Sequence, residues 1–299
     1  MSFSSMKKKS GKMDELMDQL NKIQSSEKKD YKDDRFWKPG TDPSDNGYAV
    51  IRFLPAAEGE DTPWVRLFSH GFKGKGGWFI ENCPTTIGGK CPLCEANSDL
   101  WNSGSEMDKE IARNRKRRLN YISNILVIDD PKNPDNNGKV FLYKFGKKIF
   151  DKITEAMQPE FADEDPVNPF DFWKGANFKL KIKHVAGFVN YDKSEFASPS
   201  PLHEDDEVME EIWKKQYALQ EFIAPDQFKS YDELKAKLER VLSGGARNGD
   251  VAESVEDVDK IAEQTKKEQF APKNTTESGG GGESDEEDDA MAYFNQLQQ

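Results

Sequence analysis

The stretch GGKCPLCEAN, residues 88–97, carries two cysteines, Cys91 and Cys94, separated by a proline and a leucine. Two thiolates do not complete a tetrahedral metal site, so further ligands are expected nearby. The chain contains three cysteines, and the third, Cys83, precedes this knuckle. His70 stands further upstream, which gives the pattern His-x12-Cys-x7-Cys-x2-Cys. This spacing predicts a four-ligand metal site.

Three thiolates and one imidazole form a closed, soft ligand set of the kind that binds zinc and leaves no position for a substrate. We therefore expect one structural zinc ion per chain. The alternative is that three buried thiols and a surface histidine fall together by chance. That alternative is disfavoured because all three cysteines lie within a window of 12 residues.

A zinc-dependent deaminase needs a His-x-Glu motif and a Pro-Cys-x-x-Cys motif. Here Gly71 and Phe72 follow His70, and Lys90 precedes Cys91. The sequence also contains no phosphate-binding Gly-Lys-Ser/Thr loop and no nucleophile elbow. We expect that the protein is not an enzyme.

The 299 residues suffice for one large or two smaller domains. With 33% charged and 35% hydrophobic residues, part of the chain is expected to remain unpacked. No apolar run is long enough to span a membrane, and the first residues, MSFSSMKKKSGK, lack the apolar stretch of a secretory signal. A low, odd number of cysteines is typical of a reducing cytoplasm.

The net charge of −12 is concentrated at the C-terminal end. Residues 250–299 hold 14 acidic and 4 basic residues, a net charge of −10, whereas residues 47–200 hold 22 basic and 21 acidic residues. The overall charge therefore does not exclude a nucleic-acid-binding surface in the central part.

The pattern divides the chain into three domains. Residues 1–25 contain lysines followed by an apolar stripe at helical spacing, which predicts a short amphipathic helix that needs a partner. The stripe consists of Met13, Leu16, Met17, Leu20 and Ile23. A polar link is expected over residues 25–43. Residues 250–299 combine glycines with an acidic block and are expected to be mostly disordered.

The central domain, residues 45–245, has the pattern of an antiparallel β structure. Segments rich in aromatic and β-branched residues are separated by turn signals, and six of them are expected to be strands: 48–55, 64–72, 77–82, 121–130, 139–146 and 177–185. Helices are expected over 147–157, 204–223 and 230–242. We predict a mainly β fold with α additions, in which an OB-fold barrel is one candidate, and a zinc-binding subdomain at about 64–101.

Basic and aromatic residues alternate in this domain. Six of the ten residues at 109–118 are basic: Lys109, Arg113, Arg115, Lys116, Arg117 and Arg118. A second cluster holds Tyr143, Lys144, Phe145, Lys147 and Lys148, an apparent loop holds Phe188 and Tyr191, and Trp78 and Trp101 flank the metal ligands. Such a combination favours single-stranded nucleic acid, because cations follow phosphates and rings stack on bases. A solvated loop for the charge run and core packing for the rings are the alternatives.

The sequence resembles the single-stranded DNA-binding proteins of T-even-like bacteriophages, which are helix-destabilising replication proteins. The resemblance rests on these stretches: AVIRFLP (49–55), HGFK (70–73), GWFIENC (77–83), CPLC (91–94), NILVIDDP (124–131), GKVFLYKFGKKIFDKI (138–153), GANFKLKIK (175–183) and GFVNYDKSEF (187–196). It implies an OB-fold with a zinc subdomain. It also implies a DNA cleft lined by Arg52, Lys116, Arg117, Tyr121, Tyr143, Phe188 and Tyr191.

The resemblance further implies partners. The N-terminal segment, through Lys7, Lys8, Lys9 and Ser10, would dock on the neighbouring protomer and make binding cooperative. The acidic tail would recruit polymerase, helicase loader and recombinase mediator and would compete with DNA. The implied function is sequence-independent binding of single-stranded DNA in phage replication, recombination and repair, in the host cytoplasm. A zinc-ribbon adaptor that binds protein partners, with weak nucleic-acid affinity, is the alternative function.

Overall fold

The computed structural model describes residues 33–161, 163–185 and 187–244. The predictions for residues 1–25 and for the tail at 250–299 lie outside these residues. In the described part of the chain, no helix has both the length and the apolar character needed to cross a bilayer.

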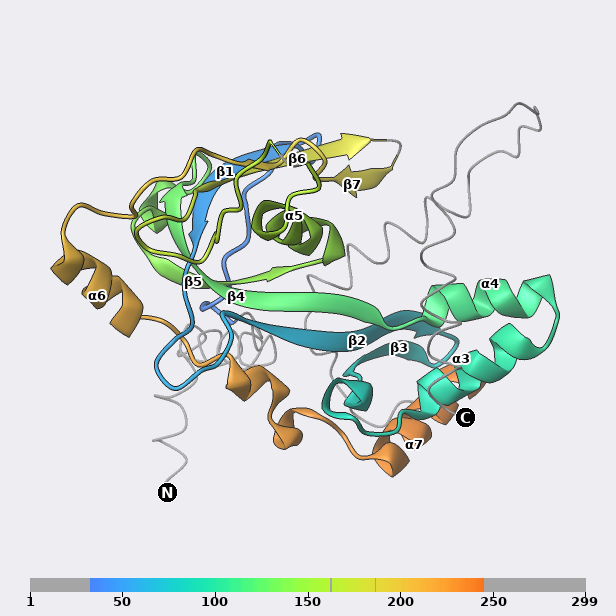
Figure 1. Cartoon of the computed structure of the whole chain (residues 1–299). Helices are drawn as coiled ribbons and strands as arrows, with labels where there is room; N and C mark the ends of the chain where they lie inside the picture. The colour runs from blue at the N-terminus through green and yellow to red at the C-terminus, as the bar shows by residue number, and fades with distance from the viewer. Residues whose placement is uncertain (1–32, 162, 186, 245–299) are drawn as a thin grey trace, which may run out of the picture.

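Eight antiparallel strands form one curled sheet (Figure 1). Its order is β3-β2-β4-β1-β6-β7, with β5 on the other edge of β4 and β8 paired to β6. The bounds are β1 Gly47–Phe53, β2 Trp64–Gly74, β3 Gly77–Asn82, β4 Arg118–Asp129, β5 Val140–Phe145, β6 Phe178–Val185, β7 Phe188–Asn190 and β8 Glu195–Phe196. The mainly β fold is confirmed, and each of the six predicted strands is present. Strands β7 and β8 lie where a loop was expected.

Strand β4 organises the sheet because it changes partner along its length. Its first half pairs with β2, its second half pairs with β1, and β5 runs along the opposite edge. Asn124 lies at the changeover, where its buried amide donates to the Tyr217 carbonyl (2.9 Å) and accepts from the Tyr217 amide (3.0 Å). The sheet therefore bends around β4 into a half-barrel.

Aromatic rings fill the concave side of the half-barrel. Phe53 contacts the rings of Phe145, Phe170 and Phe178 at centroid distances of 5.5–5.8 Å. Helix α5 (Lys147–Met157), which matches the predicted helix, buries Ile149 and Ile153 against this cluster. Because side chains alternate along each strand, the rings on one face can meet in a single core.

The other helices lie at the periphery. They are α3 (Pro92–Asn102), α4 (Glu106–Arg115), α6 (Asp206–Lys214) and α7 (Tyr231–Ser243), with short 3₁₀ segments η1 (Pro84–Ile87), η2 (Pro134–Asn136), η3 (Gln220–Ile223) and η4 (Pro225–Gln227). Helix α7 begins at a capping box of Ser230 and Glu233 and ends at Gly244, whose φ of 77° suits glycine.

The prediction of one helix over 204–223 is wrong, because α6 ends at Lys214. Beyond it, the backbone amide of Tyr217 bonds to Asn124 and that of Leu219 bonds to the Glu60 carboxylate. These amides are therefore diverted from helical bonding to distant side chains.

The polar link predicted at 25–43 is packed in its described part. Trp37 is buried, its indole donates to Asp130 (2.9 Å), and its amide donates to the Leu142 carbonyl (2.8 Å). The Leu142 amide in turn donates to the Arg35 carbonyl (2.8 Å). Residues 33–37 thus extend along β5 as part of the core domain.

Candidate metal centre and nucleic-acid interface

The four predicted metal ligands lie together. His70 is on β2, Cys83 follows β3, and Cys91 and Cys94 stand at the beginning of α3; their donor atoms all lie within 4.8 Å of one another. The Nε2 atom of His70 is 3.5 Å from the sulfurs of Cys91 and Cys94, and the sulfurs of Cys83 and Cys94 are 3.6 Å apart. Zinc–sulfur bonds of about 2.3 Å in a tetrahedron separate two sulfurs by about 3.8 Å, so the cluster is of a size that fits one metal ion.

Local sequence explains this assembly. The amide of Cys83 donates to the Phe68 carbonyl (2.8 Å), which continues the β2–β3 pairing to the first sulfur. The chain then turns through η1, whose end at Gly88 has a φ of 77°. Pro92 occupies the first turn of α3 directly after Cys91, a position that proline favours. The knuckle therefore presents both of its thiols at a helix N-terminus, which favours thiolates.

The donor groups of the site shift one another's pKa values. Hydrogen bonds with Cys91 and Cys94 lower the pKa of the Cys83 thiol, whereas hydrogen bonding to Cys83 and Cys91 raises the pKa of Cys94. Burial lowers the pKa of His70, but bonds to Cys83 and Cys91 outweigh it and raise this pKa to about 9. A divalent cation that bound here would displace the protons that take part in these hydrogen bonds.

Two hydrogen-bond routes lead from the metal ligands to the basic run. The Nδ1 atom of His70 lies 3.3 Å from the carbonyl oxygen of Arg115. The Thr85 hydroxyl lies 3.1 Å from the Cys83 sulfur and accepts a bond of 2.7 Å from the Arg117 guanidinium. Partners of this kind orient metal ligands, and here they also fix two arginines.

Helix α7 covers the metal centre from a distant part of the sequence. Leu234, Leu238 and Val241 pack with Phe72 and Phe79 in one buried cluster that also includes Cys83 and Cys91. The predicted subdomain at about 64–101 did not include this helix.

Charge and close approach hold α7 in place. The nearly buried Glu81 carboxylate pairs with Lys229 (2.7 Å) and with Lys237. A Cβ at Gly76 would lie 2.2 Å from the Arg240 carbonyl, so only glycine permits this approach of the β2–β3 turn to α7.

The basic run is a helix followed by a strand, not a loop. Helix α4 has Ser105 as its N-cap and ends at Arg115, and β4 begins at Arg118. Three guanidinium groups lie over aromatic rings: Arg113 over Trp101 (5.2 Å), Arg115 over Phe72 (5.3 Å) and Arg117 over Phe68 (4.2 Å). Arg113, Lys116 and Arg118 are exposed. The run is therefore held in place by rings.

Strand β2 carries two further candidate DNA contacts, Arg66 and Phe68, which the sequence analysis did not name. Val65 and Leu67 are buried on one face, so Arg66 and Phe68 lie on the other. Arg66 is exposed, lies over the Phe68 ring (5.5 Å) and pairs with Tyr121 on β4. The alternation in WVRLFSH was the signal that could have identified this pair.

Three predicted stacking residues contribute mainly to packing. Tyr121 stacks on Phe150 of α5 at 3.9 Å with nearly parallel rings, and it also stacks on Phe145. Tyr121, Tyr143 and Phe145 are all buried. Contact between these rings and DNA stays a prediction.

Arg52 lies apart from the other predicted contacts. It is fully buried, and its guanidinium donates to the carbonyls of Asp171 (2.9 Å) and Ser200 (2.9 Å) and to the Asn177 side chain (3.4 Å). Burial lowers its pKa. In this structure Arg52 joins β1 to two loops, and its contact with DNA stays a prediction.

The remaining predicted residues are more accessible. Phe188 is exposed on β7, Trp78 and Tyr191 are half-buried, and Lys144 and Lys147 are exposed. At these positions the side chains are accessible to single-stranded DNA.

The N-terminus of α5 favours an anion. Within the described residues, no side chain caps its first turn and no acidic residue lies in it. Lys147 and Lys148 are exposed there, and Lys148 lies 3.9 Å from Asp192, next to Tyr191. Unsatisfied amides together with two lysines attract phosphate.

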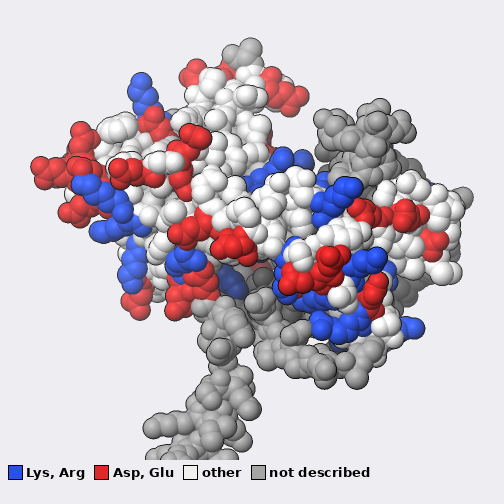
Figure 2. Space-filling model, turned by 90° about the horizontal axis from the view of Figure 1, so that it is seen from below, with Lys and Arg blue, Asp and Glu red and all other residues white. Residues whose placement is uncertain are grey.

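The underside of the molecule differs from this face. In Figure 2 acidic and basic side chains are interspersed, and among the described residues no continuous basic surface covers that side. The basic and aromatic residues described above lie on β2, at the start of β4, on α4 and at the N-terminus of α5.

Comparisons with known proteins identify relatives of this chain. Residues 45–242 match the family model described as gp32 DNA binding protein like. The single-stranded DNA-binding protein of Enterobacteria phage T2 is 41% identical over 234 residues, which cover 76% of each chain. The protein of the same name from Enterobacteria phage T4 is 39% identical over 256 residues, which cover 83% of this chain and 84% of that protein. The chain therefore belongs to the gp32-like family of DNA-binding proteins.

Proposed function

We propose that the protein binds single-stranded DNA cooperatively and without sequence preference, in phage replication, recombination and repair, with one structural zinc ion and an OB-fold core. The observation that carries this proposal is the set of arginines that lie over aromatic rings beside the metal ligands.

The strand would run from the N-terminus of α5, across Arg66 and Phe68 on β2, to Arg117 and α4. Cations along this path neutralise phosphates, and rings at its edges stack on bases. The phosphate contacts we propose are Arg66, Arg113, Arg115, Lys116, Arg117, Arg118, Lys144 and Lys147. The stacking contacts we propose are Phe68, Trp78, Trp101, Phe188 and Tyr191.

The zinc ion would be held by His70, Cys83, Cys91 and Cys94. As a closed structural site it supplies folding energy and no chemistry. Through Thr85 and the Arg115 carbonyl, its ligands hold the basic run against β2. The metal therefore supports binding indirectly, by fixing cations where phosphates pass.

Cooperativity would come from residues 1–25 docking on a neighbouring protomer, and residues 250–299 would recruit replication and recombination proteins. This role places the protein in the host cytoplasm. Both segments lie outside the described residues, and the proposal for them rests on the basic and acidic patterns of the sequence.

A fluorescence titration with oligo-dT tests the proposal. One oligomer accommodates a single protomer, the other accommodates many, and both are titrated at two salt concentrations with and without a chelator. We expect the logarithm of the affinity to fall with the logarithm of salt concentration by about 0.7 per phosphate contact. We also expect tighter binding per site on the long strand. Absence of binding at low salt would refute the proposal and favour a zinc-ribbon adaptor.

A further inference from the structure

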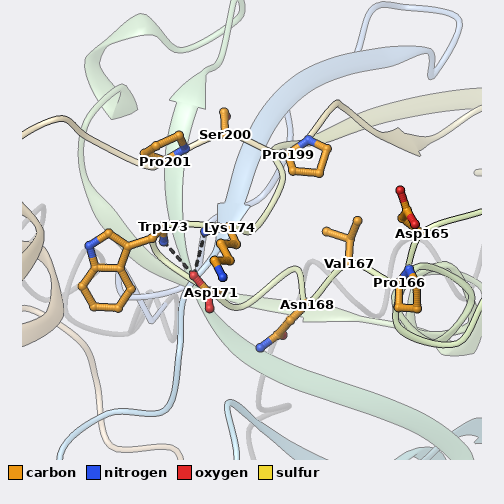
Figure 3. Close-up of a pocket in the computed structure, with 10 residues that line it drawn as sticks. All are labelled: Asp165, Pro166, Val167, Asn168, Asp171, Trp173, Lys174, Pro199, Ser200 and Pro201. Carbon is orange, nitrogen blue, oxygen red and sulfur yellow. Dashed lines mark hydrogen bonds between the residues drawn. The ribbon is translucent and has the colours of Figure 1, made fainter.

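A surface pocket of about 590 Å³ is lined by none of the residues proposed above as DNA contacts (Figure 3). The segments 165–174 and 199–201 line it, and Figure 3 shows their side chains around a common hollow. Its apolar walls are Pro166, Val167, Pro199 and Pro201. Each proline fixes its backbone φ, which restricts the conformations of these walls.

Trp173 lies at this pocket with 57% of its surface exposed. Its indole donates to Asp206 at the start of α6 (2.9 Å), and its amide donates to Asp171 (2.7 Å). An exposed tryptophan that is fixed by two hydrogen bonds loses little entropy on binding, and such residues commonly dominate protein interfaces.

The rim of the pocket is acidic. Asp165 and Asp171 line it beside Lys174, and Asp206 at the start of α6 accepts the indole N–H of Trp173. The adjoining segment 204–211 contains six acidic residues and no lysine or arginine. This rim repels phosphate, so the pocket does not belong to a DNA-binding surface. It fits a protein segment that carries several positive charges next to apolar side chains.

We propose that this pocket binds the N-terminal segment, residues 7–23, of a second copy of the chain; the inference rests on the proposed cooperative binding. Residues 1–12 contain four lysines and no acidic residue. The apolar stripe from Met13 to Ile23 follows directly. The lysines match the acidic rim, and the methionines and leucines match Trp173 and the proline walls, so both halves of the segment find complementary surface.

Charge reversal in full-length chains tests the contact. One variant carries Lys7→Glu, Lys8→Glu and Lys9→Glu, and the other carries Asp165→Lys and Glu204→Lys. We expect each variant alone to bind long oligo-dT only as tightly per site as a chain lacking residues 1–24. Binding to the short oligomer should be unchanged. A variant with Asp135→Lys and Asp232→Lys, exposed acids on η2 and α7, should bind like the unmodified chain.

An equimolar mixture of the two variants identifies the occupant. When the two variants alternate along DNA, the glutamate-bearing N-terminal segment of one variant meets the lysine-bearing pocket of the other. The unmodified segment of the second variant meets the unmodified pocket of the first. The mixture should therefore recover long-strand binding. If the mixture binds long oligo-dT no more tightly per site than the mean of the two variants, docking on a second copy is overturned. The segment would then dock within its own chain or not at all.

Trp173→Ala and Trp173→Phe separate docking from folding. The alanine variant should lose long-strand binding with an unchanged melting temperature, and the phenylalanine variant should retain most of it. Normal long-strand binding by Trp173→Ala would refute the site. If the unmodified chain does not bind the short oligomer at all, the proposed function itself is refuted.

Discussion

The imidazole Nδ1 of His70 lies 3.3 Å from the backbone carbonyl of Arg115, which joins a metal ligand to the last residue of α4. When Nε2 binds a metal ion, the neutral ring carries its proton on Nδ1 and donates it to this carbonyl. Carbonyls in the last turn of a helix lack helical partners, so this contact gives the Arg115 carbonyl a partner. The candidate metal centre thus contacts the chain at the point where the basic helix ends, before β4 begins.

Removal of the metal should loosen more than the metal ligands. We expect chelation, or His70→Ala, to lower the melting temperature and to speed amide hydrogen exchange at residues 64–101 and also at 106–118. Zinc content measured by atomic absorption should fall from one ion per chain to none. Readdition of zinc should restore the unmodified chain. His203→Ala, at an exposed histidine, serves as the control. Unchanged exchange at 106–118 would contradict the link through Arg115.

Thr85→Val should weaken DNA binding without removing the metal. It deletes the hydroxyl that accepts the Arg117 bond of 2.7 Å. One such bond contributes about 1.5–3 kcal/mol when a charged group takes part, which sets an upper limit on the loss, since a mobile Arg117 still attracts phosphate. We expect an affinity loss of at least two-fold, about 0.4 kcal/mol, at unchanged zinc content.

Thr62→Val is the matched control for Thr85→Val. It removes a hydroxyl that donates to the Trp64 carbonyl (2.9 Å) at an exposed site. Its affinity for DNA should match that of the unmodified chain. Equal losses in the two variants would show that Thr85 has no special role in positioning Arg117.

Arg66 and Phe68 should separate the two components of binding. Arg66→Ala should lower affinity and reduce the magnitude of the salt slope by about 0.7, because one phosphate contact is lost. Phe68→Leu keeps apolar volume but removes the ring, so it should cost up to about 1–3 kcal/mol with little change in slope. Lys235→Ala, exposed on α7, is the control. Identical changes in slope for the two variants would contradict this division.

Arg52→Met should affect stability and not the salt slope. The substitution removes the guanidinium that donates to the carbonyls of Asp171 and Ser200. The Asp171 carbonyl keeps a bond from the Gly175 amide, whereas the Ser200 carbonyl loses this donor, which costs at most about 1–3 kcal/mol. Urea unfolding measures this loss, and oligo-dT titration measures the slope. A reduced slope with unchanged stability would instead identify Arg52 as a phosphate contact, as the family resemblance implies.

The metal ligands were predictable because their pattern is local. Cys83, Cys91 and Cys94 lie within a short segment, and chemistry alone limits what such a set can do. The strands were predictable from alternation for the same reason, since each period lies within a few residues.

Contacts between distant segments were not predictable. Tyr121 reads as an accessible ring in the sequence, yet Phe150 of α5 stacks on it and closes one side. Helix α7 covers the metal centre through Leu234 and Leu238, although more than 130 residues separate them from Cys94 in the sequence. Burial of this kind depends on tertiary packing, which single-sequence patterns do not contain.

Deletion of residues 250–299 should tighten DNA binding at low salt. The segment carries a net charge of −10, so we expect it to compete with phosphates for the basic face. Salt screens this competition, so the difference from the full-length chain should shrink as ionic strength rises. Substitution of the six acidic residues at 283–289 by asparagine and glutamine should reproduce part of this gain in affinity in the full-length chain. Deletion of residues 290–299 alone removes no charged side chain and should not change the affinity. Equal affinity of the deleted and full-length chains at low salt would show that the tail does not compete with DNA.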